Sequence, residues 1–381
     1  MVVGVAALAV GATTLASRSA DRGTLALDPT IEQQRDSTDD AVAAGPENLP
    51  MRPLGPVEIT SEVAGDNDLL PDAAGLTLVA GRRDHLSLID LATGDIRTVR
   101  LPRSPRPPPG RSAMLSMGTD LIISRNGTVI SVAGGDGRTL LIAERQRMIP
   151  TYGDGGSIWM TDGMQSAAAS TAMRVAPDGT LLERVDLPAI TRPVAGSAEG
   201  LLVSTPGGVS MVNADGGEEI TPTGQLVAAD GERIAWVDCE AGVHCVVVLG
   251  TVDDPDQARL PLARQDVPAG YFGLPTGTYS PDGRRLAFPV YRINQWGTME
   301  RPSITIIDTA TAGEAFRVQG PFRQDNSALP LAWSPDSRWL FVASRDGVTA
   351  WNADTTEMTV LDITIDPPWG LAVLPNAPRG R

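Results

Sequence analysis

The sequence predicts an all-β fold built from repeated, four-stranded antiparallel units. Beyond Leu70 one pattern recurs: two segments of alternating apolar and polar residues, joined by a turn of Gly, Asp, Asn or Thr. Such alternation is typical of half-buried strands, and the turn residues are those of hairpins. No segment between the copies combines helical apolar spacing with capping residues, so we expect no helix there.

Seven copies of this hairpin follow one another at intervals of about 44 residues, which is typical of four-stranded propeller blades. A further strand precedes each hairpin. The segments 121–127 and 340–347 are near copies of that strand, and they end in Asn-Gly and Asp-Gly, the preferred two-residue hairpin turns. The spacing therefore predicts a seven-bladed β-propeller of four-stranded antiparallel blades. The hairpins are 86–101, 128–142, 172–187, 209–221, 245–262, 303–318 and 348–363.

The segment 367–375 indicates how the ring of blades would close. It is similar to 329–335, the innermost strand expected for the seventh blade, but no further strand follows it. We expect it to complete the first blade, whose other strands lie at about 76–101. In this arrangement both ends of the fold share one blade, and only short, protected strand edges remain.

Composition and charge restrict the function classes. The chain has 381 residues, of which 42% are hydrophobic, and this is enough for a large core. All-β folds of this length often form a single domain. The formal net charge of −15 argues against a nucleic-acid-binding protein, because phosphate contacts require a basic surface.

The N-terminal part differs from the rest. Residues 2–15 are almost entirely apolar but are shorter than the roughly 20 residues of a membrane span. We expect residues 1–17 to be a signal peptide or signal anchor whose usual basic segment is missing; a buried strand is the alternative. Residues 18–56 are acidic and aperiodic, which predicts a flexible linker, and residues 57–381 form the propeller.

Two blades share a sequence motif. Ser280-Pro-Asp-Gly-Arg-Arg-Leu-Ala-Phe and Ser334-Pro-Asp-Ser-Arg-Trp-Leu-Phe-Val each read as a turn followed by an apolar strand. In these residues the chain resembles the TolB-like and WD-repeat-like β-propellers, whose blades often carry Ser-Pro-Asp-Gly; the other five blades match by periodicity alone. The resemblance implies the fold, and it implies a binding platform more often than an enzyme.

The only two cysteines, Cys239 and Cys245, are expected on neighbouring strands of the fifth blade. Cross-strand partners can meet the spacing of a disulfide, so we predict that they are bonded. Together with an export signal, a disulfide agrees with an extracytoplasmic protein. A zinc site is the alternative, but only His85 and His244 could add imidazole ligands.

The sequence offers no clear catalytic constellation. With two histidines in the chain, a Ser-His-Asp triad has few available bases. The Ser-Pro-Asp segments are explained as turns, and Glu218 and Glu219 as solvated turn residues. A Ca²⁺ site at Asp253, Asp254 and Asp256 is conceivable, but the segment lacks a full ligand loop. We therefore predict no catalytic residue, cofactor or metal.

One face of the predicted propeller is rich in aromatic residues and Arg. The longest loops of the late blades, 264–276, 289–302 and 320–328, all emerge on this face. Aromatic residues and Arg dominate the binding energy of interfaces. The alternative is that the rings fold over to shield blade edges. The predicted binding residues are Tyr271, Phe272, Tyr291, Arg292, Trp296, Arg301, Phe322 and Arg323, and Arg103, Arg106 and Arg111 would lie on the same face.

These observations predict an extracytoplasmic, membrane-tethered, monomeric propeller that binds a protein or peptide and is not an enzyme. Its membrane contact is expected through the N-terminal segment alone. Two alternatives remain. One is a lyase or glycoside-acting propeller enzyme that uses carboxylates of the central funnel, and the other is the structural sensor head of an envelope complex.

Overall fold

The computed structural model divides by internal contacts into Met1–Gly45 and Pro46–Arg381, and every described residue belongs to the second unit. No described residue lies in a helix that could cross a membrane. The described ranges are 52–56, 58–65, 69–82, 85–101, 113–117, 120–125, 128–132, 138–144, 147–149, 157–161, 170–176, 180–187, 191–196, 199–205, 208–221, 224–240, 244–263, 266–268, 277–292, 302–320, 322, 330–344, 347–363 and 368–376.

The described part of this unit is all-β: its strands form antiparallel sheets, and its only helical turn is the short 3₁₀ segment Pro71–Ala73. We number the sheets in chain order. Sheet 1 contains β2 (Ile59–Val63), β5 (Ile96–Arg100), β4 (His85–Asp90), β3 (Leu76–Gly81) and β31 (Gly370–Pro375), in this spatial order. Sheet 2 contains β1 (Arg52–Pro56), β9 (Arg138–Glu144), β8 (Thr128–Val132), β7 (Asp120–Arg125) and β6 (Ala113–Met117).

The next three sheets each contain four consecutive strands. Sheet 3 contains β10 (Arg147–Ile149), β11 (Ile158–Thr161), β12 (Ser170–Val175) and β13 (Leu181–Leu187). Sheet 4 contains β14 (Arg192–Gly196), β15 (Leu201–Thr205), β16 (Gly208–Asn213) and β17 (Gly216–Thr221). Sheet 5 contains β18 (Gln225–Ala229), β19 (Arg233–Glu240), β20 (His244–Thr251) and β21 (Ala258–Pro261).

The last two sheets differ in their innermost strand. In sheet 6 two short strands, β22 (Asp266–Pro268) and β23 (Thr278–Tyr279), both pair with β24 (Arg285–Arg292), and β25 (Ser303–Asp308) and β26 (Gly313–Val318) follow. Sheet 7 has single strands throughout: β27 (Leu331–Trp333), β28 (Trp339–Ser344), β29 (Gly347–Asn352) and β30 (Met358–Leu361).

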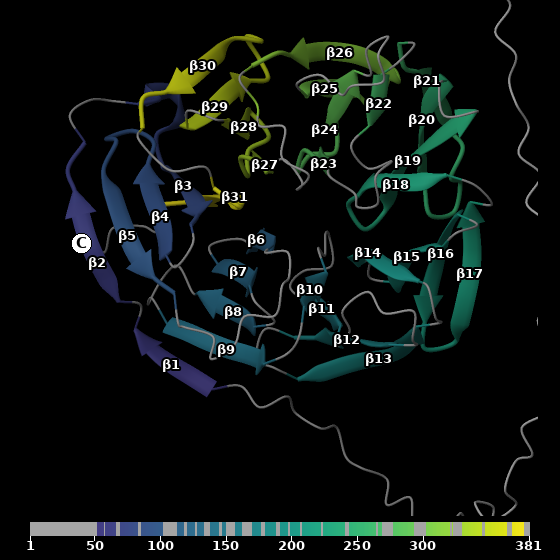
Figure 1. Cartoon of the computed structure of the whole chain (residues 1–381), viewed down its shortest axis with the longest axis horizontal. Coiled ribbons are helices and arrows are strands. Elements are labelled where there is room, and N and C mark those ends of the chain that lie inside the picture. Colours follow the sequence, from purple (N-terminus) through teal and green to yellow (C-terminus); the bar gives the residue numbers. More distant parts are fainter. Residues whose placement is uncertain are drawn as a thin grey trace, which may run out of the picture. The chain divides into compact units, whose positions relative to one another are not determined.

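Figure 1 shows these sheets side by side around a common centre, with β6, β10, β14, β18, β23, β27 and β31 nearest to it. Neighbouring innermost strands contact one another, as β18 and β23 or β27 and β31 do. This arrangement is consistent with a β-propeller. All seven predicted hairpins are present as the two outer strands of the repeat, because their Gly- and Asp-rich turns join consecutive antiparallel strands.

The strand order of sheet 1 joins distant parts of the sequence. Strand β31 pairs with β3 along its whole length, from Leu76 opposite Pro375 to Gly81 opposite Gly370. At the outer edges, β2 pairs with β5 and β1 pairs with β9, so the segment 52–63 adds a fifth strand to sheets 1 and 2. The sequence did not predict these strands, and β1 lies before the predicted propeller boundary at residue 57.

Alternating side chains of each sheet pack against the two neighbouring sheets. In β28, Leu340 is buried with Ile306 of sheet 6, while the adjacent Phe341 is buried with Ile89 of sheet 1. This is the period-two pattern expected when both faces of a strand are covered. The hydrophobic core therefore lies between the sheets.

The Ser-Pro-Asp motifs form tight turns before β24 and β28. In the first, Ser280 Oγ donates to Asp282 Oδ1 over 2.6 Å, and Asp282 Oδ1 accepts the Arg284 N–H over 3.1 Å. The fourth turn residue has a left-handed backbone in both, with φ of 66° at Gly283 and 62° at Ser337. The two turns also bond directly, because the N–H of Asp282 donates to Ser337 Oγ over 2.9 Å.

Candidate binding site

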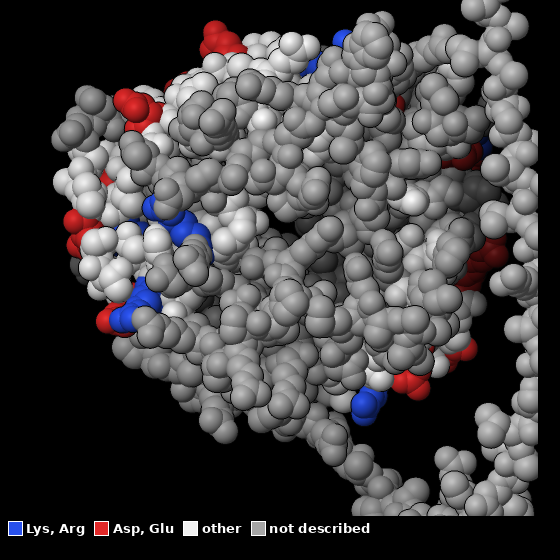
Figure 2. All heavy atoms as spheres, viewed as in Figure 1, with Lys and Arg blue, Asp and Glu red and all other residues white. Residues whose placement is uncertain are grey.

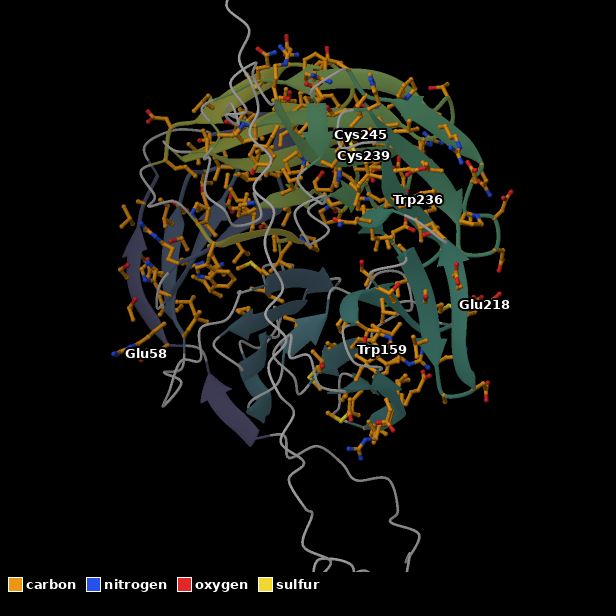
Figure 3. The ribbon with its side chains drawn as sticks, turned by 45° about the vertical axis from the view of Figure 1, so that its right-hand side comes forward. Glu58, Trp159, Glu218, Trp236, Cys239 and Cys245 are labelled. Atoms are coloured by element: carbon orange, nitrogen blue, oxygen red, sulfur yellow. A yellow bond between two sulfur atoms is a disulfide. The ribbon has the colours of Figure 1, made fainter. Side chains whose placement is uncertain are left out.

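The predicted disulfide is present between Cys239 and Cys245. These residues face each other in the register of β19 and β20, as Figure 3 shows, and Cys245 is buried. The bond joins the two strands next to the connection 241–243. This connection and the connection 293–302 of sheet 6 join equivalent strands of their sheets. The position follows from the pairing of the two strands that the sequence predicted.

A buried carboxylate marks the corresponding end of sheet 6. Asp266 begins β22, stands opposite Arg292 at the end of β24, and has a side chain that is only 1% exposed. Its backbone N–H donates to the carbonyl of Ala263 over 2.9 Å. A buried carboxylate must be paired and hydrogen-bonded, or burial would cost several kcal/mol.

Two arginines from the same sheet pair with this carboxylate. Arg317 Nη1 on β26 lies 2.7 Å from Asp266 Oδ2, and Arg292 Nε lies 3.3 Å from Asp266 Oδ1. The side chain of Arg317 is 19% exposed, whereas that of Arg292 is 55% exposed. Of the two cations that contact Asp266, Arg292 is therefore the one that is accessible from outside.

The predicted binding residues separate into two groups. Tyr291 and Phe322 are buried, with 8% and 2% exposure, so the prediction that they present a binding surface is wrong. Phe322 belongs to the apolar cluster between sheets 6 and 7, where its ring covers Gly320 so closely that a Cβ there would lie 2.9 Å from it. Aromatic rings bury large apolar areas, and here these two rings add that area to the hydrophobic core.

Arg292 is the described member of the predicted set that remains accessible. The others lie outside the described residues: Tyr271, Phe272, Trp296, Arg301 and Arg323, together with Arg103, Arg106 and Arg111. The chain nevertheless fixes where two of these segments start. The segment 269–276 leaves and rejoins the innermost edge of sheet 6, between β22 and β23, and the segment 293–301 begins directly after Arg292.

The other polar candidates are used locally or lie apart. Among the described residues no group of three or more His, Cys, Asp or Glu could hold a metal ion. Asp256 is committed to Arg259, whose Nη2 lies 2.6 Å away, and this hydrogen bond lowers the pKa of the carboxyl. Glu218 and Glu219 are exposed, but they lie on strand β17 and not in the predicted turn.

The two histidines lie on different sheets. His85 begins β4 of sheet 1, and the exposed His244 begins β20 of sheet 5. Neither histidine is among the described residues that pair with Asp266. The cluster therefore consists of one carboxylate and two guanidinium groups, without an imidazole. This set can hold a charged group in place, but it offers no general base of ordinary histidine type.

Sequence reasoning missed Asp266 and Arg317. It assigned 264–276 to a loop, in which an Asp is ordinarily solvated, and it placed position 317 within the hairpin 303–318 without giving Arg317 a role. The available signal was the short Asp-Val-Pro segment, which carries one apolar residue between two turn-forming ones and is too brief for a periodicity argument. Only the pairing with Arg292 identifies it as a strand.

The geometry suits recognition of an anionic group. The Nε of Arg292 is oriented by Asp266, and its half-exposed guanidinium can still offer paired donors to a carboxylate. The chain as a whole is acidic, with a net charge of −15, and Figure 2 shows acidic side chains at several places on the rim.

No family model matches the chain, and no curated protein matches its sequence. Among solved structures it is similar to hydrazine synthase of Kuenenia stuttgartiensis, with 15% identity, a TM-score of 0.48, and coverage of 66% of this chain and 78% of that one. A putative 6-phosphogluconolactonase of Bacteroides fragilis has 14% identity, a TM-score of 0.47, and coverage of 80% and 99%. Apo AztD of Citrobacter koseri has 12% identity, a TM-score of 0.48, and coverage of 78% and 97%. These similarities assign neither a family nor an activity.

Proposed function

We propose that the chain is a seven-bladed β-propeller, closed by pairing of its C-terminal strand with the first blade, that binds a protein or peptide. The ring is supported by the seven described sheets and by the pairing of β31 with β3. The protein is extracytoplasmic, tethered by its N-terminal segment, and acts as a binding platform and not as an enzyme. The disulfide between Cys239 and Cys245 supports an oxidising compartment.

One observation carries the location of the site: the exposed Arg292 is held by the buried Asp266, which Arg317 holds in turn. Preorganisation of this kind reduces the entropy lost when a side chain binds a partner. The segment 293–301 follows Arg292 directly in the sequence and carries Trp296, and aromatic residues supply apolar contact area at interfaces. We propose that the partner presents a carboxylate to Arg292.

Cross-linking and co-purification of the full chain from its native envelope test this function. The Arg292→Ala variant should lose the co-purified partner. Arg284→Ala is the matched control, because Arg284 is 82% exposed and lies just before the start of β24, at the opposite end from Arg292. If both variants retain the partner equally, the site is wrong, and if turnover of a substrate is abolished by a carboxylate replacement instead, the platform is an enzyme.

A further inference from the structure

Strand β30 forms the outer edge of sheet 7. The outermost strands of sheets 1 and 2, β5 and β9, are covered by β2 and β1. Among the described residues, the outermost strands of the other five sheets have no further strand beside them. An uncovered strand edge exposes unpaired N–H and C=O groups, and proteins protect such edges with charged residues or proline.

Four of these five strands contain such residues in their sequences, and β30 does not. Strand β30 reads Met-Thr-Val-Leu, with no charged residue and no proline. Its side chains are exposed, Met358 by 45% and Val360 by 55%. The sequences of the other four strands contain charged residues or proline: Glu183, Arg184 and Asp186 in β13, Glu218 and Glu219 in β17, Arg259 and Pro261 in β21, and Glu314 and Arg317 in β26.

The backbone of β30 presents its free groups outward at the same two residues. The N–H of Asn352 donates to the carbonyl of Glu357 over 2.8 Å, which fixes the alternation of the ladder with β29. Met358 and Val360 therefore stand in non-hydrogen-bonded positions opposite Trp351 and Thr349. Their N–H and C=O groups point away from β29, toward the open edge.

We propose that β30 is a docking strand, to which an extended segment of a separate partner protein adds in antiparallel orientation. Such strand addition obtains affinity from main-chain hydrogen bonds and specificity from side chains. Exposed carboxylates flank the edge at Glu357 and Asp362. The segment that fits is therefore a short run of β-branched residues with a basic residue at each end.

The charges argue against a second copy as the occupant. If two copies paired their residues 357–362 in full antiparallel register, Glu357 of each would face Asp362 of the other. Like charges directly opposite each other destabilise a strand pair. The net charge of −15 per chain adds repulsion at longer range.

A six-residue peptide, Arg-Thr-Val-Thr-Val-Arg with blocked ends and a fluorophore, tests the proposal by fluorescence anisotropy with the full chain. Its first Arg would face Asp362 and its last would face Glu357. A peptide with Glu in place of both Arg is the control ligand. We expect the basic peptide to bind at least about tenfold more tightly than the acidic one, which is 1.4 kcal/mol.

Two variants remove the edge in different ways. Val360→Lys places a cation on the exposed strand and should weaken basic-peptide binding at least about tenfold. Val360→Pro should do the same, because it removes an N–H that points outward and leaves the ladder with β29 intact. Leu182→Lys is the matched control, since Leu182 is 50% exposed on the already charged outer strand β13, and it should leave binding unchanged.

Three results would overturn the proposal. One is no binding of the basic peptide to the full chain, and another is binding that both Val360 variants leave intact. The third is a concentration-dependent dimer that Val360→Lys dissolves, because the occupant would then be a second copy. Arg292→Ala should not alter peptide binding, so a failure here and a failure of the site at Arg292 can be distinguished.

Discussion

Replacement of Gly283 by Ala tests how consecutive sheets are connected. The backbone of Gly283 is left-handed, with φ of 66°, and an added Cβ would lie 0.8 Å from Arg233 Nη1 of sheet 5. Arg233 would have to leave a position in which it pairs with Asp230 at 3.2 Å and lies 6.0 Å from the centroid of the Tyr279 ring. The variant therefore disturbs both the backbone and a contact between two sheets.

The two costs can be estimated separately. A left-handed backbone costs a non-glycine residue about 1–2 kcal/mol. Displacing Arg233 adds about 0.5–1 kcal/mol for the cation–π contact. It adds a similar amount for a solvent-screened ion pair, since the Arg233 side chain is 34% exposed. We expect the free energy of unfolding to fall by about 2–4 kcal/mol in total.

Gly75→Ala is the matched control, because Gly75 has φ of 86° but no atom within 4 Å of an added Cβ. It should lose only the backbone cost of about 1–2 kcal/mol. Urea unfolding followed by tryptophan fluorescence measures both variants, and a cycle with Arg233→Ala should give a coupling energy of about 1–2 kcal/mol. Equal losses for Gly283→Ala and Gly75→Ala, with no coupling to Arg233, would refute the contact.

Four further outcomes are expected. Cys239→Ser should lower the free energy of unfolding by about 2 kcal/mol, because the bond spans a sequence separation of 6, and calorimetry under oxidising conditions measures it. Asp282 is partly desolvated, but hydrogen bonds and arginine charges of its turn lower its pKa below the ordinary 3.8. The wild type should therefore be more stable than Asp282→Asn above about pH 4, and this difference in stability should be lost as the pH falls further. Arg317→Met should destabilise the fold by up to about 3 kcal/mol, and Asp266→Leu in the same chain should restore much of this loss, because the buried charge is then removed with its partner. Deletion of residues 367–381 removes β31 and should lower the melting temperature; an unchanged value would contradict a ring closed by this strand.

The repeated hairpins could be predicted from the sequence because each is local. Their strands and turn lie within one short segment, so alternation and turn chemistry suffice. Strands β1 and β2 could not be predicted in this way, since Arg52–Pro56 contains two prolines and becomes a strand only by pairing with the distant β9. Pairing partners far apart in sequence leave little local signal, and this accounts for the unpredicted fifth strands.

The candidate site was predicted only in part for a related reason. The concentration of aromatic residues and Arg pointed to the end of sheet 6 where Arg292 lies, but residue type does not separate a core ring from a surface ring. Tyr291 and Phe322 are buried in the core, whereas Arg292 is exposed. The burial of Asp266 depends on a strand of three residues, which is too short for any periodicity to show.

The proposed site lies in sheet 6, where the innermost strand departs from the regular four-stranded repeat. A regular blade needs one continuous innermost strand, yet in sheet 6 that edge is divided between β22 and β23, and a buried charge stands at its start. An apolar residue in place of Asp266 would avoid the desolvation cost of the carboxylate, so the fold alone does not require this charge. Departures from local consistency of this kind are expected at functional sites.

Replacing the buried charges by apolar residues therefore gives a test. A chain with both Asp266→Leu and Arg317→Met should keep its fold but lose partner binding, because Arg292 would no longer be oriented.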